Sequence, residues 1–433
     1  MTTRSRWNGE ALSAAREALL RERRAGGADP ACESQVREII ARVRAGGDRT
    51  LSELAQRFDG VAPSALAVPA ATLVAARDAL EPGVRRALEH AARNLERAHE
   101  AFRPCAVEVE TEPGVRVGRR PDPLARVGVY APGGRAAYAS SVLMACIPAR
   151  VAGVAQIVVC SPPQRGTGLP SDVVMAAAHL AGATEVVTAG GAGAIAALAY
   201  GTESLAPVER IVGPGNAWVA EAKRQVAGVV GIDSPAGPSE LLVIADDAAD
   251  ADGIARELLA QAEHDPEAVA IAVAIGPRIA AAMQTALERA LAGAPSGAYA
   301  AALVRRGGVV RADDAGEALA FANAFAPEHL LLALSAPEAT LAEVRGAGAV
   351  FVGATSSVVF GDYLAGGNHV LPTGGAARAC SGLSTLDFVR WTAWQRVSEA
   401  GAAALAGDAG ALAEAEGLPA HAAAARAWAG AVR

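Results

Sequence analysis

The stretch Ala125-Arg-Val-Gly-Val-Tyr-Ala-Pro-Gly-Gly134 decides the fold. Its apolar first half, Ala125–Tyr130, has the character of a buried strand, and the loop Ala131–Gly134 ends that strand. We expect a helix over Ser140–Ala152 and a second apolar strand over Gln156–Cys160. Because a strand, a helix and a strand in this order make the two strands parallel, the stretch predicts a parallel sheet covered by helices on both faces.

The same alternation continues on both sides of a Pro/Gly-rich turn, Ser234–Ser239. Before the turn, the predicted elements are helices and strands at Asp172–Ala181, Glu185–Ala189, Ile195–Tyr200, Arg210–Val212 and Ala217–Ala227. After the turn, the predicted strands are Leu241–Ala245, Ala268–Ala274, Leu303–Arg305, His329–Leu334 and Ala349–Phe351. The fold class is therefore α/β, with two Rossmann-like parallel-sheet domains and helical extensions at both ends.

We expect four segments along the chain. Residues 1–26 form an N-terminal extension with an amphipathic helix over 8–26 that ends at Gly26-Gly27. Residues 27–129 together with 241–383 form the first α/β domain, with helices near Cys32–Ala45 and Pro82–Phe102. Residues 130–240 form the second α/β domain, and residues 384–433 form an Ala-rich tail that is helical from about Asp387.

Composition excludes several classes of protein. With 52% hydrophobic residues in 433, the chain can bury several cores, and a net charge of −7 argues against binding to nucleic acid or to a membrane surface. The longest uncharged stretch, Val186–Thr202, contains four glycines and is shorter than the ~20 apolar residues of a spanning helix. No signal peptide is visible, so we expect a cytoplasmic protein.

Cysteine and lysine usage is also informative. The chain has five cysteines with no C-x-x-C spacing, which argues against a disulfide framework or a cysteine zinc cage. Cys146 and Cys160 are expected to be small core residues. Lys223 is the one lysine among 39 basic residues, a bias toward arginine that we attribute to nucleotide composition.

Three glycine-rich loops follow predicted strands, where open α/β sheets bind ligands. They are Tyr130–Gly134, Gly191–Ala196 and Gly213–Asn216. The second fits the G-x-G-x-x-A dinucleotide fingerprint between a strand and a helix, with Glu209 as the nearest acidic partner. A chain rich in Ala and Gly can produce this motif by chance, and the third loop can equally be a tight turn. Together the loops favour a nucleotide ligand.

Four of the seven histidines lie in polar, loop-adjacent settings, and the other three, His90, His99 and His179, are expected to be partly exposed helix residues. Gln261 and His264 share one helix face and could share a metal, although the spacing can be coincidental. Glu328 and His329, at a strand entrance, could supply a base and a second proton acceptor, or they could form a solvated turn.

Asp362 and His369 lie in a glycine-rich stretch that suggests backbone shaped around a ligand. Glu416 precedes a break in the Ala-rich tail, and His421 falls in the first turn of the next helix. Two imidazoles, a carboxylate and an amide oxygen form a mixed nitrogen and oxygen set that suits Zn²⁺ or Mn²⁺.

Seven runs of sequence together resemble histidinol dehydrogenase: Gly213–Asn216, Glu221–Gln225, Asp233–Glu240, Gln261–His264, Pro327–Leu330, Asn368–Thr373 and Glu416–His421. The matching positions extend from residue 130 to residue 421 in the family's order. The resemblance implies an aldehyde/histidinol dehydrogenase-like fold. It also implies zinc-dependent oxidation of L-histidinol, through L-histidinaldehyde, to L-histidine with two NAD⁺, the last step of histidine biosynthesis.

The resemblance also implies a role for individual residues. The Zn²⁺ ligands are Gln261, His264, Asp362 and His421. The catalytic pair is Glu328 and His329. Histidinol is held by Ser239, His369 and Glu416 together with the metal ligands and His329, whereas NAD contacts Tyr130, Asn216 and the position of Gly193. Members of the family are domain-swapped homodimers, so His421 is expected to come from the other chain.

Two positions depart from the family pattern, and two rival functions follow from the same residues. Gly193 stands where the family usually carries glutamine, and Ala365-Gly-Gly367 replaces a serine-containing approach to Asn368 and His369.

A related zinc and NAD dehydrogenase could act on another small alcohol, such as a sulfonated diol. A zinc hydrolase could use the same ligands with Glu328 as the base for water, although the nucleotide-type loops disfavour it.

Overall fold

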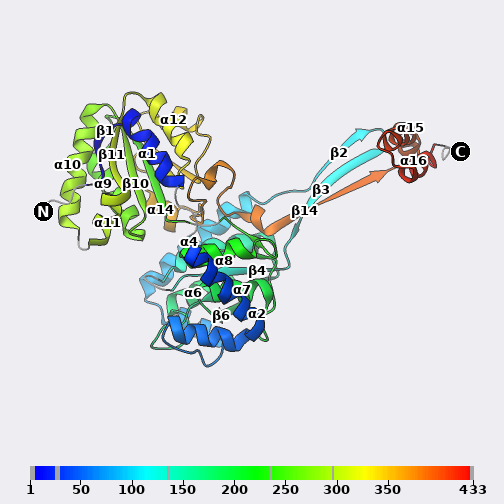
Figure 1. Ribbon diagram of the computed structural model, residues 1–433, viewed down its shortest axis with the longest axis horizontal. Coiled ribbons are helices and arrows are strands. Elements are labelled where there is room, and N and C mark those ends of the chain that lie inside the picture. The colour runs from blue at the N-terminus through cyan, green and yellow to red at the C-terminus, as the bar shows by residue number, and fades with distance from the viewer. Residues whose placement is uncertain (1–4, 25–29, 134–136, 235–236, 295–296, 430–433) are drawn as a thin grey trace.

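The computed structural model describes residues 5–24, 30–133, 137–234, 237–294 and 297–429. These residues form two α/β lobes and a long arm that extends away from both lobes (Figure 1). We call the lobes A and B. Lobe A contains the helices between residues 30 and 101 and the sheet between residues 126 and 232, and lobe B contains residues 5–24 and the sheet that begins at residue 240.

Lobe A is built on a five-stranded parallel sheet in the order β6-β5-β4-β7-β8. Its strands are β4 (Arg126–Tyr130), β5 (Gln156–Ser161), β6 (Glu185–Thr188), β7 (Arg210–Val212) and β8 (Gly231–Ile232). One face carries α5 (Ala139–Ala152) and α6 (Asp172–Ala181), and the other carries α7 (Gly191–Tyr200) and α8 (Ala217–Val226). This order, in which the chain starts in the middle and winds outward in both directions, is that of a Rossmann-like sheet.

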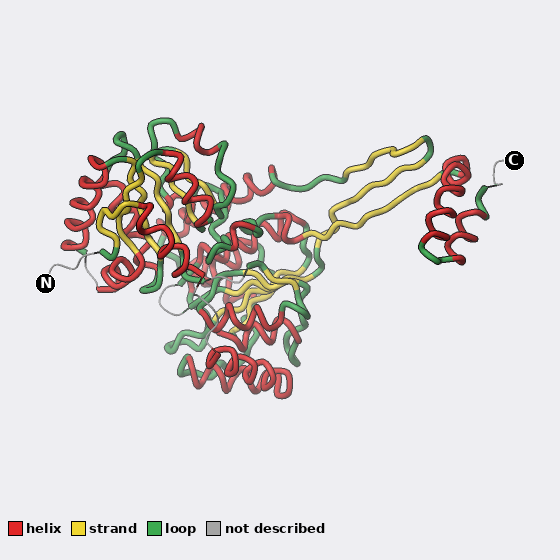
Figure 2. The backbone as a smooth tube through the Cα atoms, turned by 45° about the horizontal axis from the view of Figure 1, so that its top comes forward, coloured by secondary structure: helices red, strands yellow, loops and turns green. Residues whose placement is uncertain are grey.

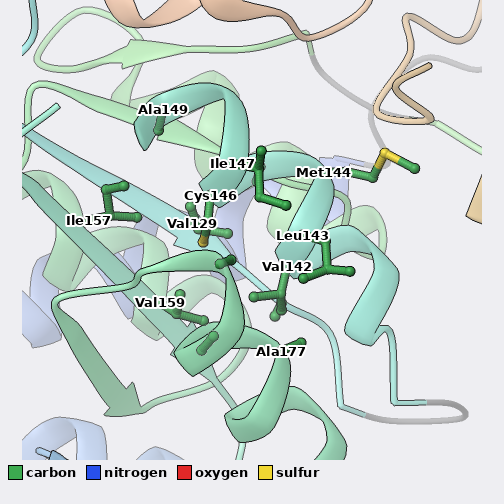
Figure 3. Packing of buried hydrophobic residues seen from close by; sticks show 14 of the residues in the cluster. Val129, Val142, Leu143, Met144, Cys146, Ile147, Ala149, Ile157, Val159 and Ala177 are labelled. Carbon is green, nitrogen blue, oxygen red and sulfur yellow. The ribbon is translucent and has the colours of Figure 1, made fainter. Parts of the chain in front are cut away.

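Alternation along the strands supplies both cores of lobe A. Val129 of β4 and Val159 of β5 face Val142 and Cys146 of α5, as Figure 3 shows. Val158 and Cys160 point to the opposite core. The prediction that Cys146 and Cys160 are core residues is confirmed, and burial raises the pKa of both thiols, that of Cys160 to about 12.

Three N-terminal helices, α2 (Pro30–Phe58), α3 (Ala70–Ala79) and α4 (Pro82–Ala101), also belong to lobe A. Leu51 and Leu54 of α2 share a core with α7, whereas Leu73 of α3 and Leu95 of α4 share the other core with α5 and α6. The prediction that residues 27–129 join residues 241–383 is therefore wrong. The helix faces alone carried no information about which sheet they would cover, and the boundary at residue 130 cuts the central strand β4.

One histidine of these helices differs from expectation. His99 of α4 is 1% exposed, whereas a partly exposed side chain was expected. It packs edge-on against the ring of Phe102, and burial lowers its pKa to about 4. His99 is therefore a neutral core residue.

Lobe B is built on a six-stranded parallel sheet in the order β1-β11-β10-β9-β12-β13. Its strands are β1 (Trp7–Ala11), β9 (Glu240–Ala245), β10 (Val269–Ile275), β11 (Gly307–Ala312), β12 (His329–Ala333) and β13 (Ala349–Val352). One face packs against α9 (Ala251–His264), α10 (Pro277–Gly293) and α11 (Gly297–Arg306), and the other against α1 (Leu12–Arg24) and α12 (Ala315–Phe325). Two short helices, α13 (Pro337–Leu341) and α14 (Val358–Tyr363), follow β12 and β13.

Two predicted elements of lobe B differ from the structure. Residues 303–305, predicted as a strand, end helix α11, because a short apolar run fits a buried helix face as well as a strand. Residues 8–11, predicted as the start of a helix, form most of β1, which pairs with β11 and makes the N-terminal extension part of lobe B. The predicted helix end at Gly26-Gly27 lies outside the described residues.

The arm is a three-stranded antiparallel sheet of β2 (Val107–Glu112), β3 (Val115–Pro123) and β14 (Val389–Val397). It ends in α15 (Glu399–Ala415) and α16 (Pro419–Arg426), far from both lobes in both views (Figures 1 and 2). The prediction of a helical tail from Asp387 is therefore wrong for β14, which forms because it pairs with β3 over its whole length. None of the helices in the described part of the chain is long and apolar enough to cross a bilayer.

Candidate active site

A cleft between the lobes is lined by the carboxyl ends of strands in lobe A and by the amino ends of strands in lobe B. Tyr130, Gly191 and Asn216 line it from the carboxyl ends of β4, β6 and β7, and Glu240 and His329 line it from the amino ends of β9 and β12. These two groups of strand ends are close along the chain, because β8 ends at Ile232 and β9 begins at Glu240.

The predicted catalytic pair lies at the amino edge of lobe B and is buried. Glu328 and His329 are each 5% exposed, and His329 Nδ1 lies 3.5 Å from Glu328 Oε2. Glu240 holds both residues from the neighbouring strand: its backbone N–H donates to Glu328 Oε2 (2.7 Å), and its carbonyl oxygen lies 3.1 Å from His329 Nδ1. The side chain of Glu240 accepts from the backbone N–H groups of Glu328 (3.3 Å) and Gly374 (3.1 Å).

Burial and charge shift the pKa values of this pair strongly. Burial raises the pKa of Glu328 to about 7, although His329 opposes the shift. Burial lowers the pKa of His329, but Glu328 and Asp362 outweigh burial and raise it to about 9. The carboxylate of Asp362 contributes because its Oδ1 lies 3.6 Å from His329 Nε2. A carboxyl group with a pKa near neutrality can act as a general base or acid at physiological pH.

His369 connects the two lobes as a neutral imidazole. Its Nδ1 lies 2.8 Å from the backbone oxygen of Asp362, which can only accept, so Nδ1 carries the proton. Its Nε2 therefore accepts from the hydroxyl of Ser141 in lobe A (3.0 Å). Burial lowers the pKa of His369. The neighbouring Asn368 side chain donates to the backbone oxygen of Met144 (2.6 Å), a second contact with α5.

Three of the four predicted metal ligands are held by neighbouring elements of lobe B. Gln261 and His264 lie in the last turn of α9, and Asp362 lies in α14. The carboxylate of Asp362 interacts electrostatically with His264. The Nδ1 of His264 lies 3.3 Å from the backbone oxygen of Gln261, which leaves Nε2 free of this contact. The amide nitrogen of the buried Gln261 side chain, Nε2, has no hydrogen-bond partner among the described residues, so no hydrogen bond from this nitrogen fixes the orientation of the amide.

Two predicted residues are not brought to this cleft by their own chain. Glu416 ends α15 and His421 lies in α16, both at the tip of the arm and exposed to solvent (Figure 2). In agreement with this separation, no group of three or more His, Cys, Asp and Glu side chains within the described ranges could hold a metal ion. Of the four predicted ligands, Gln261, His264 and Asp362 therefore lie in lobe B, whereas His421 of the same chain lies apart from them.

The residues predicted for NAD lie at the carboxyl edge of the lobe A sheet. The hydroxyl of Tyr130 accepts from the backbone N–H of Gly191 (3.0 Å), and burial raises its pKa to about 12. The side chain of Asn216 caps α8 by accepting from the N–H groups of Trp218 and Val219. Gly134, in the first glycine-rich loop, lies outside the described residues.

The predicted acidic partner of the G-x-G-x-x-A turn is wrong. The carboxylate of Glu209 accepts from the backbone N–H of Ala125 (2.6 Å), just before β4 begins. That contact lies at the amino edge of the sheet, opposite the edge at which Gly191 begins α7. The separation along a strand cannot be read from residue spacing, which is why Glu209 was the nearest candidate only in sequence.

With this geometry established, comparison with known proteins is informative. A sequence model described as histidinol dehydrogenase matches residues 22–428. The chain belongs to the histidinol dehydrogenase family. It is 46% identical over 388 residues to a histidinol dehydrogenase of Methanothermobacter thermautotrophicus, covering 89% of this chain and 91% of the relative. It is 48% identical over 390 residues to one of Rhizobium meliloti, covering 89% of each chain.

The fold agrees with the same family. The crystal structure of a histidinol dehydrogenase from Elizabethkingia anophelis superposes with a TM-score of 0.93 at 32% identity, covering 99% of this chain and 98% of that one. The predicted α/β class with two Rossmann-like sheets is therefore confirmed. Histidinol dehydrogenases are NAD-dependent oxidoreductases, so this chain belongs to that class of enzyme.

Both departures of this histidinol dehydrogenase family member have a structural counterpart. Gly193 is buried inside α7, where an added Cβ would lie 2.9 Å from Leu54 Cδ1, so α2 occupies the space of a side chain. Gly366 has φ +92° and an added Cβ would lie 2.8 Å from the backbone oxygen of Asn94. Glycine at 366 therefore allows the segment that leads to His369 to pack closely on α4.

Proposed function

We propose that this chain oxidises L-histidinol through L-histidinaldehyde to L-histidine and reduces two NAD⁺, the last step of histidine biosynthesis. One observation carries the proposal: the Glu328–His329 pair is buried in the cleft of a histidinol dehydrogenase family member, and the pKa of Glu328 is raised to about 7. A buried base with this pKa suits proton transfer at neutral pH.

Each protein group has one task in the proposed sequence. His329 accepts the proton of the histidinol hydroxyl while a hydride leaves the same carbon for the first NAD⁺, which gives the aldehyde and NADH. Glu328 takes a proton from water as the water adds to the aldehyde, which gives the hydrate anion. A second hydride then leaves the carbon of the hydrate anion for a second NAD⁺, and loss of the remaining hydroxyl proton gives the carboxylate of histidine. The cleft keeps the reactive aldehyde from bulk water between the two steps.

We infer that histidinol and NAD bind on opposite sides of the cleft. Ser239, His369 and Glu416 are proposed to hold histidinol, a cation that suits the carboxylates of Asp362 and Glu416. Tyr130, Asn216 and the backbone at Gly193 are proposed to contact NAD at the carboxyl edge of the lobe A sheet, where open α/β sheets bind nucleotides.

We propose Zn²⁺ as the metal, held by the Gln261 amide oxygen, His264 Nε2, the Asp362 carboxylate and His421 of the partner subunit. The donor chemistry supports this set, because each of the three ligands on one chain has a free donor atom or a carboxylate. Bound Zn²⁺ supplies a template that orients the amine and imidazole of histidinol. A cation beside Asp362 would also weaken the attraction between Asp362 and His329 and so lower the pKa of His329, which favours the neutral form that accepts a proton.

The proposed assembly is a homodimer in which each arm completes the site of the other chain. The arm exposes large apolar side chains, which are costly to leave in water: Val107, Val109, Trp391, Val397, Leu412, Leu418 and Trp428. The tail that carries Glu416 and His421 is held away from its own cleft. We place the reaction in the cytoplasm, in keeping with five cysteines that are free thiols.

The stoichiometry of the reaction tests the proposed function. We expect two NADH per histidine formed from L-histidinol, loss of both after treatment with a chelator, and recovery on addition of Zn²⁺. A panel of small alcohols that includes a sulfonated diol serves as the control for substrate choice. No NADH from histidinol in zinc-loaded protein at saturating NAD⁺ would contradict the proposal.

A further inference from the structure

A buried ion pair holds the start of the third glycine-rich loop. Lys223 of α8 is 1% exposed and pairs with the carboxylate of Asp233, the first residue after β8. The ammonium group of Lys223 donates to the backbone oxygen of Gly213 (3.0 Å), and the backbone N–H of Gly213 donates to Asp233 Oδ2 (2.7 Å). Both backbone polar groups of one residue are therefore held by the two members of one ion pair.

Gly213 is a point of close contact in the cleft wall. Its φ is +113°, and an added Cβ would lie 2.3 Å from the backbone oxygen of Tyr130. The loop that it begins leads to Asn216, the cap of α8. The ion pair therefore sets the position of the Gly213–Asn216 loop against Tyr130. Both Tyr130 and Asn216 belong to the proposed NAD site.

Asp233 also begins the linker between the lobes. The chain runs from Asp233 to Ser239 and into Glu240, which holds Glu328 and His329. The same ion pair therefore touches the loop on the NAD side and the segment that leads to the substrate side.

The identity of the basic residue is informative. Lys223 is the one lysine in a chain whose 39 basic residues are otherwise arginine. An ammonium group is compact and can donate to Gly213 and contact Asp233 in a pocket closed to solvent, whereas a guanidinium is planar and larger. Buried ion pairs contribute little to net stability compared with apolar residues of similar size, so stability alone does not account for this one.

We propose that Lys223 and Asp233 are positioning residues that hold the Gly213–Asn216 loop for NAD binding. The inference rests on the proposed function and on the proposed side of the cleft for NAD. It concerns the shape of the NAD side and not the chemical step, because both side chains bind the backbone of Gly213.

The test separates positioning from stability by removing one charge or both. Lys223→Met leaves Asp233 buried without a partner, so both thermal stability and NADH affinity should fall. The double variant Lys223→Met/Asp233→Leu should recover most of the thermal stability, yet its Kd for NADH, measured by fluorescence titration of the zinc-loaded protein, should stay about tenfold or more above that of wild type. Zinc content should not change.

The Arg126–Glu185 pair supplies a matched control at the opposite edge of the same sheet, with Arg126 Nη1 2.7 Å from Glu185 Oε1. Arg126→Met/Glu185→Leu should leave the Kd for NADH unchanged. If the Lys223→Met/Asp233→Leu protein does not fold, Lys223→Arg decides, because it keeps the charge and should raise the Kd while the protein remains folded. A folded double variant or Lys223→Arg variant with the wild-type Kd would overturn the inference, whereas wild-type protein that binds no NADH would overturn the proposed NAD site beneath it.

Discussion

Glu328 and His329 owe their position to backbone and side-chain contacts with Glu240 on the neighbouring parallel strand. Strand β9 begins with Glu240 and strand β12 begins with His329. The register between the two strands therefore sets the distance between these two residues. The arrangement shields Glu328 from water, and this burial raises its pKa, although the nearby His329 opposes the shift. The two residues are thus poised to divide two proton transfers between them.

Replacement of Glu328 by Gln should impair aldehyde oxidation more than alcohol oxidation. The amide keeps the volume of the side chain but cannot take a proton from water, so the second half-reaction should slow by about a hundredfold or more. Single-turnover measurements that start from histidinol and from histidinaldehyde compare the two steps. Equal losses in both half-reactions would sink the assignment of Glu328 as the base for water.

Replacement of Glu240 by Gln should lower kcat through misplacement of the catalytic pair. The amide can accept at only one of its two ends, so the N–H of either Glu328 or Gly374 loses its acceptor, at a cost of about 1–3 kcal/mol in the free energy of unfolding. Steady-state kinetics and urea unfolding measure both effects. Glu96→Gln, which removes an exposed ion pair with Arg150, is the control, and wild-type kcat in Glu240→Gln would contradict the role of Glu240.

Much of the site at this level could be predicted from the sequence, but its supports could not. Glu328, His329 and His369 were found because a charged or imidazole side chain beside an apolar strand or among glycines has no simple structural purpose. Glu240 was missed, although it stands at the start of a strand in a quoted motif, because its partners lie 88 residues away. Glu209 was chosen by proximity in sequence and lies at the wrong edge of the sheet.

Helix α4 contains a group whose titration should destabilise the fold in acid. The pKa of His99 is lowered from 6.5 to about 4 by burial, so between these values the unfolded chain binds a proton that the folded chain does not. The free energy of unfolding should therefore fall by roughly 1–2 kcal/mol as the pH drops from 6.5 to 4.5. Urea unfolding of wild type and His99→Leu at both pH values measures this contribution, and an identical pH dependence in the two proteins would refute it.

The elements that sequence reasoning predicted correctly are the buried strands and the amphipathic or apolar helices of the two lobes. Those that it missed depend on partners far along the chain. Strand β14 pairs with β3 across more than 250 residues, and β1 pairs with β11 across at least 300. Local pattern cannot reveal such pairings, and the short apolar run at residues 303–305 is compatible with either a strand or a helix.

In the whole molecule, the tip of the arm lies away from both lobes. The two lobes could be predicted from two series of strands. The assignment of α2, α3 and α4 to lobe A could not be predicted, because the sequence does not show which sheet an apolar helix face packs against. The arm holds Glu416 and His421 far from the cleft that contains Gln261, His264 and Asp362. Two such chains, related by a twofold axis, would supply each other's missing residues.

Replacement of His421 by Asn should strip Zn²⁺ from an otherwise folded protein. Loss of one imidazole leaves three ligands, so most of the metal should leave during dialysis. Metal analysis after dialysis, with circular dichroism as a check on folding, makes the comparison. His90→Asn, which changes an exposed histidine of α4, is the control and should keep its metal; unchanged zinc in His421→Asn would rule out the proposed ligand set.

The most direct test of the account is the activity of a purified heterodimer, made by co-expression, in which one chain carries Glu328→Gln and the other carries His421→Asn. If each arm completes the neighbouring cleft, both defects fall in one site and the second site is intact, so we expect about half of the wild-type rate of histidine formation, although each variant alone forms histidine very slowly. If the arm serves its own cleft, every site contains one defect. A heterodimer as inactive as its two parents would contradict the account.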